Sequence, residues 1–279
     1  MRLQEYGVGI FTTVATKSAL KKILKKECIR VNGTIASTAT LIRGGERISL
    51  SSFKDSEHVK KVNLRLSVLF EDDHLALIYK PAGLLVNGNV LKTVANGLPK
   101  NIAPSLLPDA TRPQPVHRLD FATTGILLVG KTASSIRALN KRFEQRAIEK
   151  EYYAVTIGKM PSKGTITTEV DGKPSQTNYT VCGSVPSDRF GLLNLVLLHP
   201  KTGRRHQLRK HLSQMGNPIL GDDIYGNEGL ILKGKGLYLH AYSLLFTHPF
   251  TDKEIHFQAK LPKRFTKIFP ADTWGIHNT

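Results

Sequence analysis

From residue 65 onward the sequence is a succession of short apolar runs with the pattern of β-strands, and only two segments have a helical pattern. The predicted helices cover about residues 132–148 and 205–215, and Gly216 is placed to end the second. Strands that outnumber helices and do not alternate with them argue against a doubly wound sheet. We therefore predict an α+β domain on a mainly antiparallel sheet over residues 65–270. Its predicted strands cover residues 66–70, 75–79, 125–129, 152–157, 192–198, 237–245 and 254–258.

Residues 1–52 are predicted to form a small α+β domain that precedes this sheet, and the polar residues 53–64 a linker. A helix pattern begins near Ser18, with apolar residues on one side and lysines off that side. Asn32-Gly33 follows as a tight-turn signal. Ammonium groups along one face of a helix suit contact with a phosphate backbone, although they are also compatible with a solvated surface. The candidate RNA contacts of this helix are Lys22, Lys25 and Lys26.

The chain has 40 Lys and Arg against 22 Asp and Glu in 279 residues, a net charge of +18 and a pI near 9.9. Such an excess attracts polyanions whatever the fold, with nucleic acid the first candidate and an anionic membrane surface the second. No apolar run approaches the length needed to span a bilayer. Cys28 and Cys182 are far apart and outside any C-x-x-C, so we expect a reducing compartment, the cytoplasm.

The segment 115–125 crowds polar groups at the start of a predicted strand. His117, Arg118 and Asp120 lie within four residues, and small residues then form a turn. Polar groups at the mouth of a buried strand are costly unless they serve a site or a network, so a structural salt bridge is the alternative. A kinase catalytic loop is excluded, because Leu119 separates Arg118 from Asp120 and the D-F-G motif is absent.

The block H-R-L-D-F-A-T-T-G at 117–125 resembles the motif H-R-L-D-x-x-T-S-G of the RluA-type RNA pseudouridine synthases, with Thr124 in place of serine. Several blocks in one order are far more specific than a single short motif, and the resemblance covers about residues 65–265. The further blocks are K-P-A-G-L at 80–84, K-E-Y-Y-A at 150–154, T-G-R-R-H-Q-L-R-K-H at 202–211 and P-I-L-G-D at 218–222. In the N-terminal part, V-N-G at 31–33 and G-G-E-R-I at 44–48 resemble the alpha-L RNA-binding domain.

The resemblance implies the pseudouridine synthase fold and a cofactor-free enzyme that isomerises uridine in structured RNA. Asp120 is then the catalytic aspartate, which attacks the ribose or removes a ribose proton. Tyr152 packs on the target base and assists proton removal at C5, with Tyr153 as the alternative if the register slips by one. Arg209 pairs with the aspartate. The implied RNA- or substrate-binding residues are His117, Arg118, Thr123, Arg204 and His206.

Three other classes of protein remain to be weighed. A ribosome-assembly factor with the same fold would bind RNA without changing it, a glycosylase would release the base, and a peripheral membrane protein would explain only the charge. His206 and His211 lack the H-E-x-x-H spacing and an acidic cluster, so we expect no metal site. We expect a monomer that binds structured RNA, ribosomal RNA before transfer RNA, and neither DNA nor a membrane.

Overall fold

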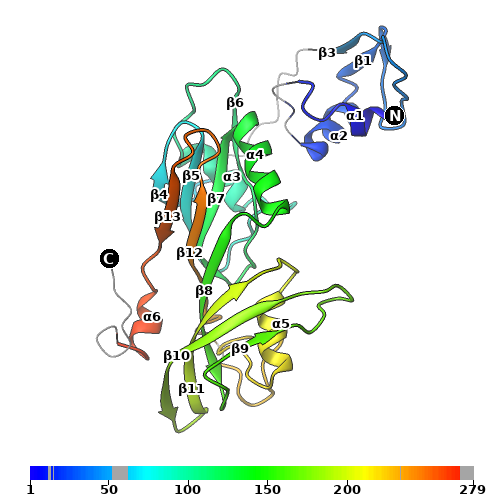
Figure 1. Cartoon of the computed structure of the whole chain (residues 1–279). Helices are drawn as coiled ribbons and strands as arrows, with labels where there is room; N and C mark the ends of the chain where they lie inside the picture. Colours follow the sequence, from blue (N-terminus) through cyan, green and yellow to red (C-terminus); the bar gives the residue numbers. More distant parts are fainter. Residues whose placement is uncertain (12–13, 15, 52–61, 233, 271–279) are drawn as a thin grey trace.

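The described residues form two separate β-sheets, one of three strands and one of ten (Figure 1). The computed structural model describes residues 1–11, 14, 16–51, 62–232 and 234–270. Most of the predicted linker, residues 53–61, lies outside the described residues. Within the described ranges, no helix is both long and apolar enough to cross a membrane.

The N-terminal sheet has the strand order β2-β1-β3, and its pairings are antiparallel. The predicted helix is α2, which begins where the Thr16 hydroxyl accepts a hydrogen bond from the Ala19 amide at 3.1 Å. Asn32 and Gly33 have positive φ values of 49° and 85°, so the predicted tight turn is confirmed. Leu3 is among the buried side chains of a core formed within this part of the chain. The elements are α1 (Leu3–Tyr6), α2 (Lys17–Lys25), β1 (Ile29–Val31), β2 (Thr34–Ile35) and β3 (Ile48–Leu50).

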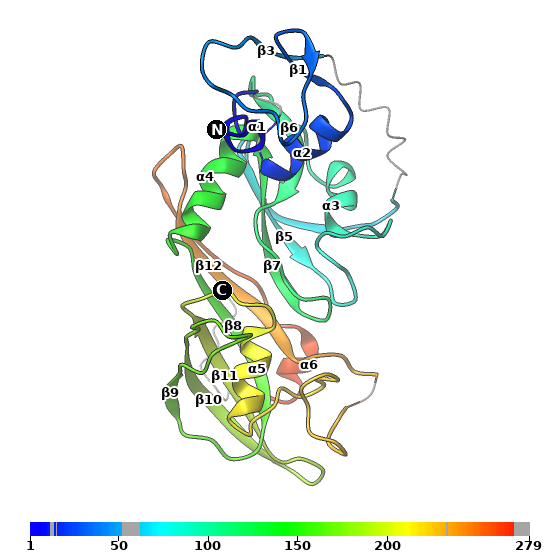
Figure 2. The ribbon, with the colours of Figure 1, turned by 90° about the vertical axis from the view of Figure 1, so that its right-hand side faces the viewer.

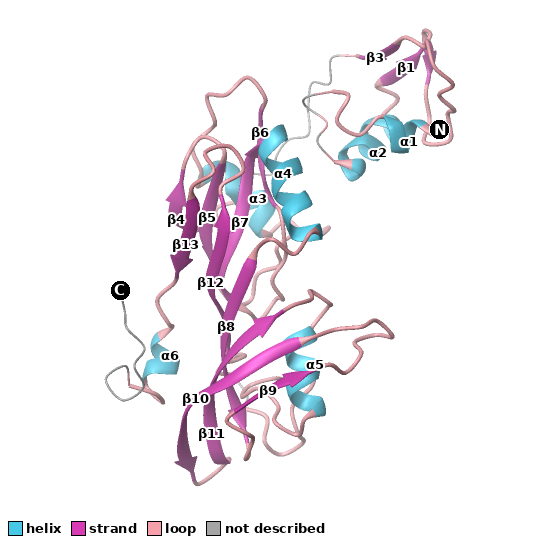
Figure 3. Cartoon of the chain, in the orientation of Figure 1, coloured by secondary structure: helices cyan, strands magenta, loops and turns pink. Residues whose placement is uncertain are grey.

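The large sheet has the order β4-β5-β7-β12-β8-β11-β10-β9, with β6 paired to β7 and β13 to β12 (Figure 3). Every pairing is antiparallel except that of β7 with β12. The predicted α+β class with a mainly antiparallel sheet is therefore confirmed. The strands are β4 (Ser67–Glu71), β5 (Leu75–Lys80), β6 (Ala110–Pro115), β7 (Thr124–Thr132), β8 (Glu149–Ile157), β9 (Lys163–Ile166), β10 (Thr177–Ser187), β11 (Gly191–Pro200), β12 (Leu239–Thr247) and β13 (Glu254–Gln258).

Two longer helices lie on the large sheet, α4 beside the half with β5 and β7 and α5 beside the half with β8, β10 and β11 (Figure 2). A capping box at Thr132 and Ser135 begins α4. The predicted helix 132–148 is too long, because Arg146 has a φ of 59° and β8 begins at residue 149. Gly216 follows α5 with a φ of 80°, as predicted. The helices are α3 (Val94–Gly97), the 3-10 helix η1 (Leu98–Lys100), α4 (Ala133–Glu144), α5 (Gln207–Gln214) and α6 (Lys263–Thr266).

Three strands, β6, β9 and β10, are missing from the sequence prediction. The strand β6 contains Pro113 and Pro115, and proline in a sequence argues against a strand. In β10 buried, half-buried and exposed residues are mixed without a regular alternation, and Gly183 lies at a bulge opposite β11. Both strands lack the continuous apolar run that identifies a buried strand, and pairing with neighbours decides their conformation.

The parallel contact between β7 and β12 fixes where the polar block 117–125 lies. Thr124 and Gly125 pair with His240 and Ala241. Gly125 has a φ of 121°, and a Cβ atom there would lie 2.2 Å from the carbonyl oxygen of Ala241. Only glycine permits this approach, which brings the end of the polar block against the centre of the sheet.

Candidate active site

A pocket of about 620 Å³ lies where four separate segments meet beside Leu239, the first residue of β12. The segments are the loop 116–123 before β7, residues 143–146 at the end of α4, the side of β8 that carries Lys150 and Tyr152, and residues 200–209, which lead from β11 into α5. Seven Lys or Arg side chains line the pocket, against two carboxylates. The pocket is therefore strongly cationic, which favours a polyanionic ligand.

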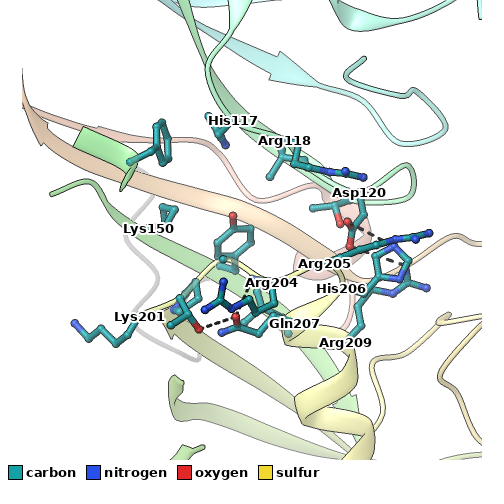
Figure 4. Close-up of a pocket in the computed structure, with 18 of the residues that line it drawn as sticks. His117, Arg118, Asp120, Lys150, Lys201, Arg204, Arg205, His206, Gln207 and Arg209 are labelled. Carbon is teal, nitrogen blue, oxygen red and sulfur yellow. Dashed lines mark hydrogen bonds and ion pairs between the residues drawn. The ribbon is translucent and has the colours of Figure 1, made fainter. Parts of the chain in front are cut away.

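Asp120 lies in a turn in which the Thr123 amide donates to the Asp120 carbonyl at 3.1 Å. Its carboxylate oxygens lie 3.7 Å from Nε2 of His206 and 4.0 Å from Nη1 of Arg209. Figure 4 shows these three side chains gathered on one side of the pocket. The Asp120 side chain keeps 16% of its surface exposed, so a ligand in the pocket can reach the carboxylate.

The closest carboxylate to Arg209 is Asp222, which differs from the expected pairing with Asp120. Nε and Nη2 of Arg209 donate to the two carboxylate oxygens of Asp222 at 2.8 and 2.7 Å. Burial alone would raise the pKa of Asp222, but hydrogen bonds from Arg209 and from the amides of Tyr225 and Ile224 lower it. Likewise, burial opposes the charge on Arg209, and Asp222 outweighs it and raises the pKa of the guanidinium. Arg209 is thus held in one orientation by Asp222, with its remaining nitrogen toward Asp120.

Of the two adjacent tyrosines on β8, Tyr152 lines the pocket and Tyr153 does not. Tyr153 is buried in the core on the other face of the strand, with its ring 4.9 Å from that of Tyr242. Burial, and then the negative charge of Asp120, raise the pKa of Tyr152 above its ordinary value. The phenol in the pocket is therefore protonated at neutral pH and lies in the electrostatic field of Asp120.

The two histidines at α5 are engaged by protein groups. His206 has a left-handed φ of 55°, and its Nδ1 lies 2.9 Å from the Tyr225 hydroxyl. Burial lowers the pKa of His206, against the opposing effect of Asp120. His211 is buried among Thr168, Ser175 and Thr177. Across the described part of the chain, no three His, Cys, Asp or Glu side chains are grouped to hold a metal ion.

Of the other residues predicted to bind RNA or substrate, four line the pocket and the three N-terminal lysines do not. Nε2 of His117 accepts the Leu128 amide at 2.9 Å, and burial lowers the pKa of the ring to about 3, so His117 is a neutral wall residue. The Thr123 hydroxyl is buried beside the pocket without a hydrogen-bond partner. Arg118 is exposed at the pocket, and Arg204 lines it while donating to the Pro174 carbonyl at 3.3 Å. The three candidate lysines of the N-terminal part are exposed and lie outside the pocket lining: Lys22 and Lys25 in α2, and Lys26 directly after it.

Two residues that support the site were not assigned from the sequence. Asp222 is one, and Lys80 at the end of β5 is the other. Nζ of the buried Lys80 donates to the carbonyls of Pro81, Phe121 and Thr123 at 2.9, 3.2 and 2.8 Å. Burial lowers the pKa of Lys80 to about 8, although Asp120 opposes this. Lys80 lies in the block K-P-A-G-L and Asp222 in the block P-I-L-G-D. These blocks could have identified both residues as candidates, but they do not show which groups the two side chains contact.

Known proteins with similar sequences and folds give one consistent answer. The family model for RNA pseudouridylate synthase matches residues 74–214. Ribosomal large subunit pseudouridine synthase D of Nitrosomonas europaea is 31% identical over 92% of this chain and 80% of its own. Ribosomal large subunit pseudouridine synthase C of Escherichia coli K12 is 31% identical over 88% of this chain and 85% of its own. The solved structure of human RNA pseudouridylate synthase domain containing 4 superposes with a TM-score of 0.58 and 28% identity, over 72% of this chain and 90% of that one. With the family model covering half of the sequence and relatives above 30% identity spanning most of it, the chain belongs to the RNA pseudouridylate synthase family.

Proposed function

We propose that this chain converts uridine in large-subunit ribosomal RNA to pseudouridine, with Asp120 as the catalytic residue. Membership of the family makes it an RNA pseudouridine synthase. The observation that carries the residue assignment is the reachable carboxylate of Asp120 in a cationic pocket, facing Arg209 and His206 and close enough to Tyr152 to raise the pKa of its phenol. The names of the relatives favour ribosomal RNA over transfer RNA.

The reaction is an isomerisation and consumes no second substrate. The N1–C1′ bond of the uridine breaks, the uracil turns, and a C5–C1′ bond forms. The proton on C5 leaves and N1 gains one, so atoms and charge balance. Asp120 acts either by attacking C1′ to form an ester, which the returning uracil displaces, or by removing the C2′ proton, which is later returned. Both routes require a carboxylate beside the ribose.

The target nucleotide has to leave its helix before Asp120 can reach the sugar. Flipping a base costs a few kcal/mol, and an inserted side chain offsets part of that cost. Arg118 is suited to this role, because it is exposed and lies two residues before Asp120 at the pocket. The hydroxyl of Thr123 has no hydrogen-bond partner but is buried beside the pocket, so it can bond the nucleotide only if binding exposes it.

Tyr152 provides an aromatic surface for the uracil, and stacking on such a ring contributes about 1–3 kcal/mol per base. The resemblance assigns its phenol a further role, which is to assist the removal of the C5 proton. Arg209 is held by Asp222 and directs a positive charge at Asp120, which orients the carboxylate. Electrostatic orientation of this kind is effective because the groups do not reorganise during the reaction.

The test is to map pseudouridines in total RNA from cells with and without the gene, complemented with wild-type or Asp120→Asn protein. Asp120→Asn keeps the shape of the side chain and removes its charge and basicity, so we expect formation to fall to background while RNA affinity and folding persist. Thermal melting checks the fold. Unchanged pseudouridine at every position would support the RNA-binding assembly factor instead, and an abasic site would support a glycosylase.

A further inference from the structure

Lys150 lies in the same pocket as Asp120, but away from the Asp120 carboxylate. It precedes Tyr152 by two residues on β8, so both side chains point to one face of the strand. Lys150 is half-buried and lines the pocket together with Arg146. In Figure 4, Lys150 and His117 are on one side of the pocket, and Asp120, His206 and Arg209 are on the other.

No carboxylate lies within ion-pair distance of Lys150 in the part of the chain that the structure describes. Glu149 and Glu151 alternate with Lys150 along the strand and point to its other face, where Glu151 lies 3.5 Å from His199. Glu144 lines the pocket and forms no ion pair with Lys150. The contact that Lys150 does make is with the ring of Phe143, with Nζ 5.7 Å from its centroid.

The surroundings of Lys150 are cationic or neutral. Burial, and then the charge of Arg146, lower the pKa of Lys150. His117 is neutral, because burial and the charge of Lys150 lower its pKa to about 3. On the facing segment, Lys201 and Arg204 also line the pocket. A half-buried ammonium group without an anion destabilises the free protein, and an anion brought by a ligand would remove that penalty.

We propose that Lys150, with Arg146 beside it, binds the backbone phosphate next to the nucleotide that occupies the Asp120 site. The ligand of this subsite is thus a phosphodiester. The proposal rests on the proposed function only in taking the neighbouring nucleotide to be the target uridine. The Cα atoms of residues two apart on a strand are about 6.7 Å apart, roughly the length of one nucleotide in an extended strand, so Lys150 and Tyr152 start from positions one nucleotide apart on the same face. The subsite holds the chain beside the flipped base and takes no part in bond breaking.

The first measurement is the salt dependence of binding to the pentaribonucleotide AAUAA, whose single uridine fixes the register. Lys150→Gln should reduce the slope of log affinity against log salt by about 0.7, the value for one phosphate contact with a single strand. Across a tenfold rise in salt, the wild type should thus lose about five times more affinity than the variant. Lys150→Arg should keep the wild-type slope. Lys141→Gln is the matched control, because Lys141 is exposed and does not line the pocket.

The second measurement replaces each of the phosphates of AAUAA in turn by an uncharged methylphosphonate. One replacement beside the uridine should weaken binding to the wild type and have no effect on Lys150→Gln. The proposed subsite is refuted if the wild type and Lys150→Gln have equal salt slopes, or if every methylphosphonate replacement weakens the binding of both proteins equally. If Lys150→Gln does not fold, Lys150→Met retains the apolar part of the side chain and removes the same charge.

Pseudouridine formation in cellular RNA is measured with the same proteins, so the two proposals fail separately. A wild type that forms pseudouridine while Lys150→Gln keeps the full salt slope refutes the phosphate subsite alone. A wild type that forms none, with a slope that falls by about 0.7 in Lys150→Gln, refutes the isomerase assignment and leaves the subsite in place.

Discussion

Three carboxylates lie within 4.0 Å of Arg209: the buried Asp222, the exposed Asp223 at 3.7 Å, and Asp120 in the pocket. The difference in distance between Asp222 and Asp120 decides what each of these two does. Asp222 accepts two hydrogen bonds from Arg209 below 3 Å, whereas Asp120 lies 4.0 Å away. A guanidinium with a fixed bidentate partner cannot turn to follow a second carboxylate. Asp222 therefore stabilises the buried arginine, and Asp120 remains available to the ligand.

Asp222→Asn should destabilise the protein strongly, because it removes the negative charge and one of the two acceptor oxygens that hold the buried Arg209. Breaking a buried pair from one side costs about 3–5 kcal/mol. Turnover should fall as well, since Arg209 can then move toward Asp120. Urea unfolding and pseudouridine formation measure the two effects. Asp223→Asn is the control, because that side chain is 79% exposed and should change stability by less than about 0.5 kcal/mol.

The pH dependence of stability provides a second check on Asp222. The pKa of Asp222 is lowered in the folded state. Its charge therefore contributes fully to the free energy of unfolding above the unfolded-state pKa of about 3.9, and this contribution is lost as the pH falls through the folded-state pKa. Wild-type stability should therefore decline below about pH 4 more steeply than that of Asp222→Asn. Urea unfolding midpoints of both proteins, taken at several pH values from neutral to acid, measure this difference. If stability falls equally with pH in both proteins, Asp222 is not the group responsible.

Tyr152→Phe and Tyr153→Phe form a matched pair that tests which tyrosine serves the reaction. Tyr152→Phe retains the ring in the pocket and removes the phenol, so RNA binding should persist while turnover falls. Tyr153→Phe changes a core position on the other face and should leave turnover near the wild-type level. Single-turnover rates and gel-shift affinities distinguish these outcomes. A fully active Tyr152→Phe with an inactive Tyr153→Phe would reverse the register.

At the scale of elements, the junction of β7 with β12 determines whether the site can form. β7 is buried along its whole length, and its first residues carry the polar block against β12. The Lys80 ammonium at the end of the neighbouring β5 holds the same loop by three carbonyl oxygens. Strand pairing and this buried cation together give Asp120 a rigid support, which its proposed catalytic role requires.

Gly125→Ala should prevent this junction from closing. The added Cβ would lie 2.2 Å from the Ala241 carbonyl oxygen at a φ of 121°, so the backbone of β7 or β12 would have to move. We expect a loss of more than about 3 kcal/mol, measured as a fall in Tm. Gly172→Ala is the control, since Gly172 also has positive φ, 67°, but faces open space and should lose only about 1–2 kcal/mol. Similar losses for both variants would show that the close approach is unimportant.

At the scale of the whole molecule, the net charge of +18 comes both from the N-terminal part, which forms the small sheet, and from the part that forms the large sheet. The pocket accounts for seven Lys or Arg side chains, and the exposed face of α2 supplies others. The division into an N-terminal RNA-binding domain, a linker and a catalytic domain stays a prediction, and α2 is its testable part. Phosphate contacts far from the pocket would add affinity without altering the chemistry.

The combined variant Lys22→Gln, Lys25→Gln and Lys26→Gln, which changes two lysines of α2 and the one that follows it, should weaken binding to folded ribosomal RNA and flatten its salt dependence. Each lost phosphate contact should reduce the slope of log affinity against log salt by about 0.7–0.9, the values for single strands and for B-form duplexes. The rate of the chemical step with bound RNA should not change, because none of the three lines the pocket. Affinity measured at several salt concentrations tests this, with melting as the control for folding. An unchanged slope would show that α2 is only a solvated surface.

Local patterns in the sequence were sufficient for the fold class, seven of the strands, the helix α2 and the end of α5. The apolar periodicity of a buried element and a glycine at its end are properties of neighbouring residues, so they can be read along the chain. The contiguous motif blocks also placed Asp120, Tyr152 and Arg209 among the candidates, and in the structure all three line one pocket.

The tertiary structure alone decided which groups meet. Nothing in the spacing shows that Arg209 takes Asp222 as its close partner, that Lys80 binds carbonyl oxygens about forty residues away, or that His117 accepts a backbone amide. Hydrogen bonds and ion pairs depend on differences of about 1 Å, which strand register and the parallel pairing of β7 with β12 set. The sequence by itself determined the elements and the chemical groups, and packing between distant segments determined which of those groups became partners.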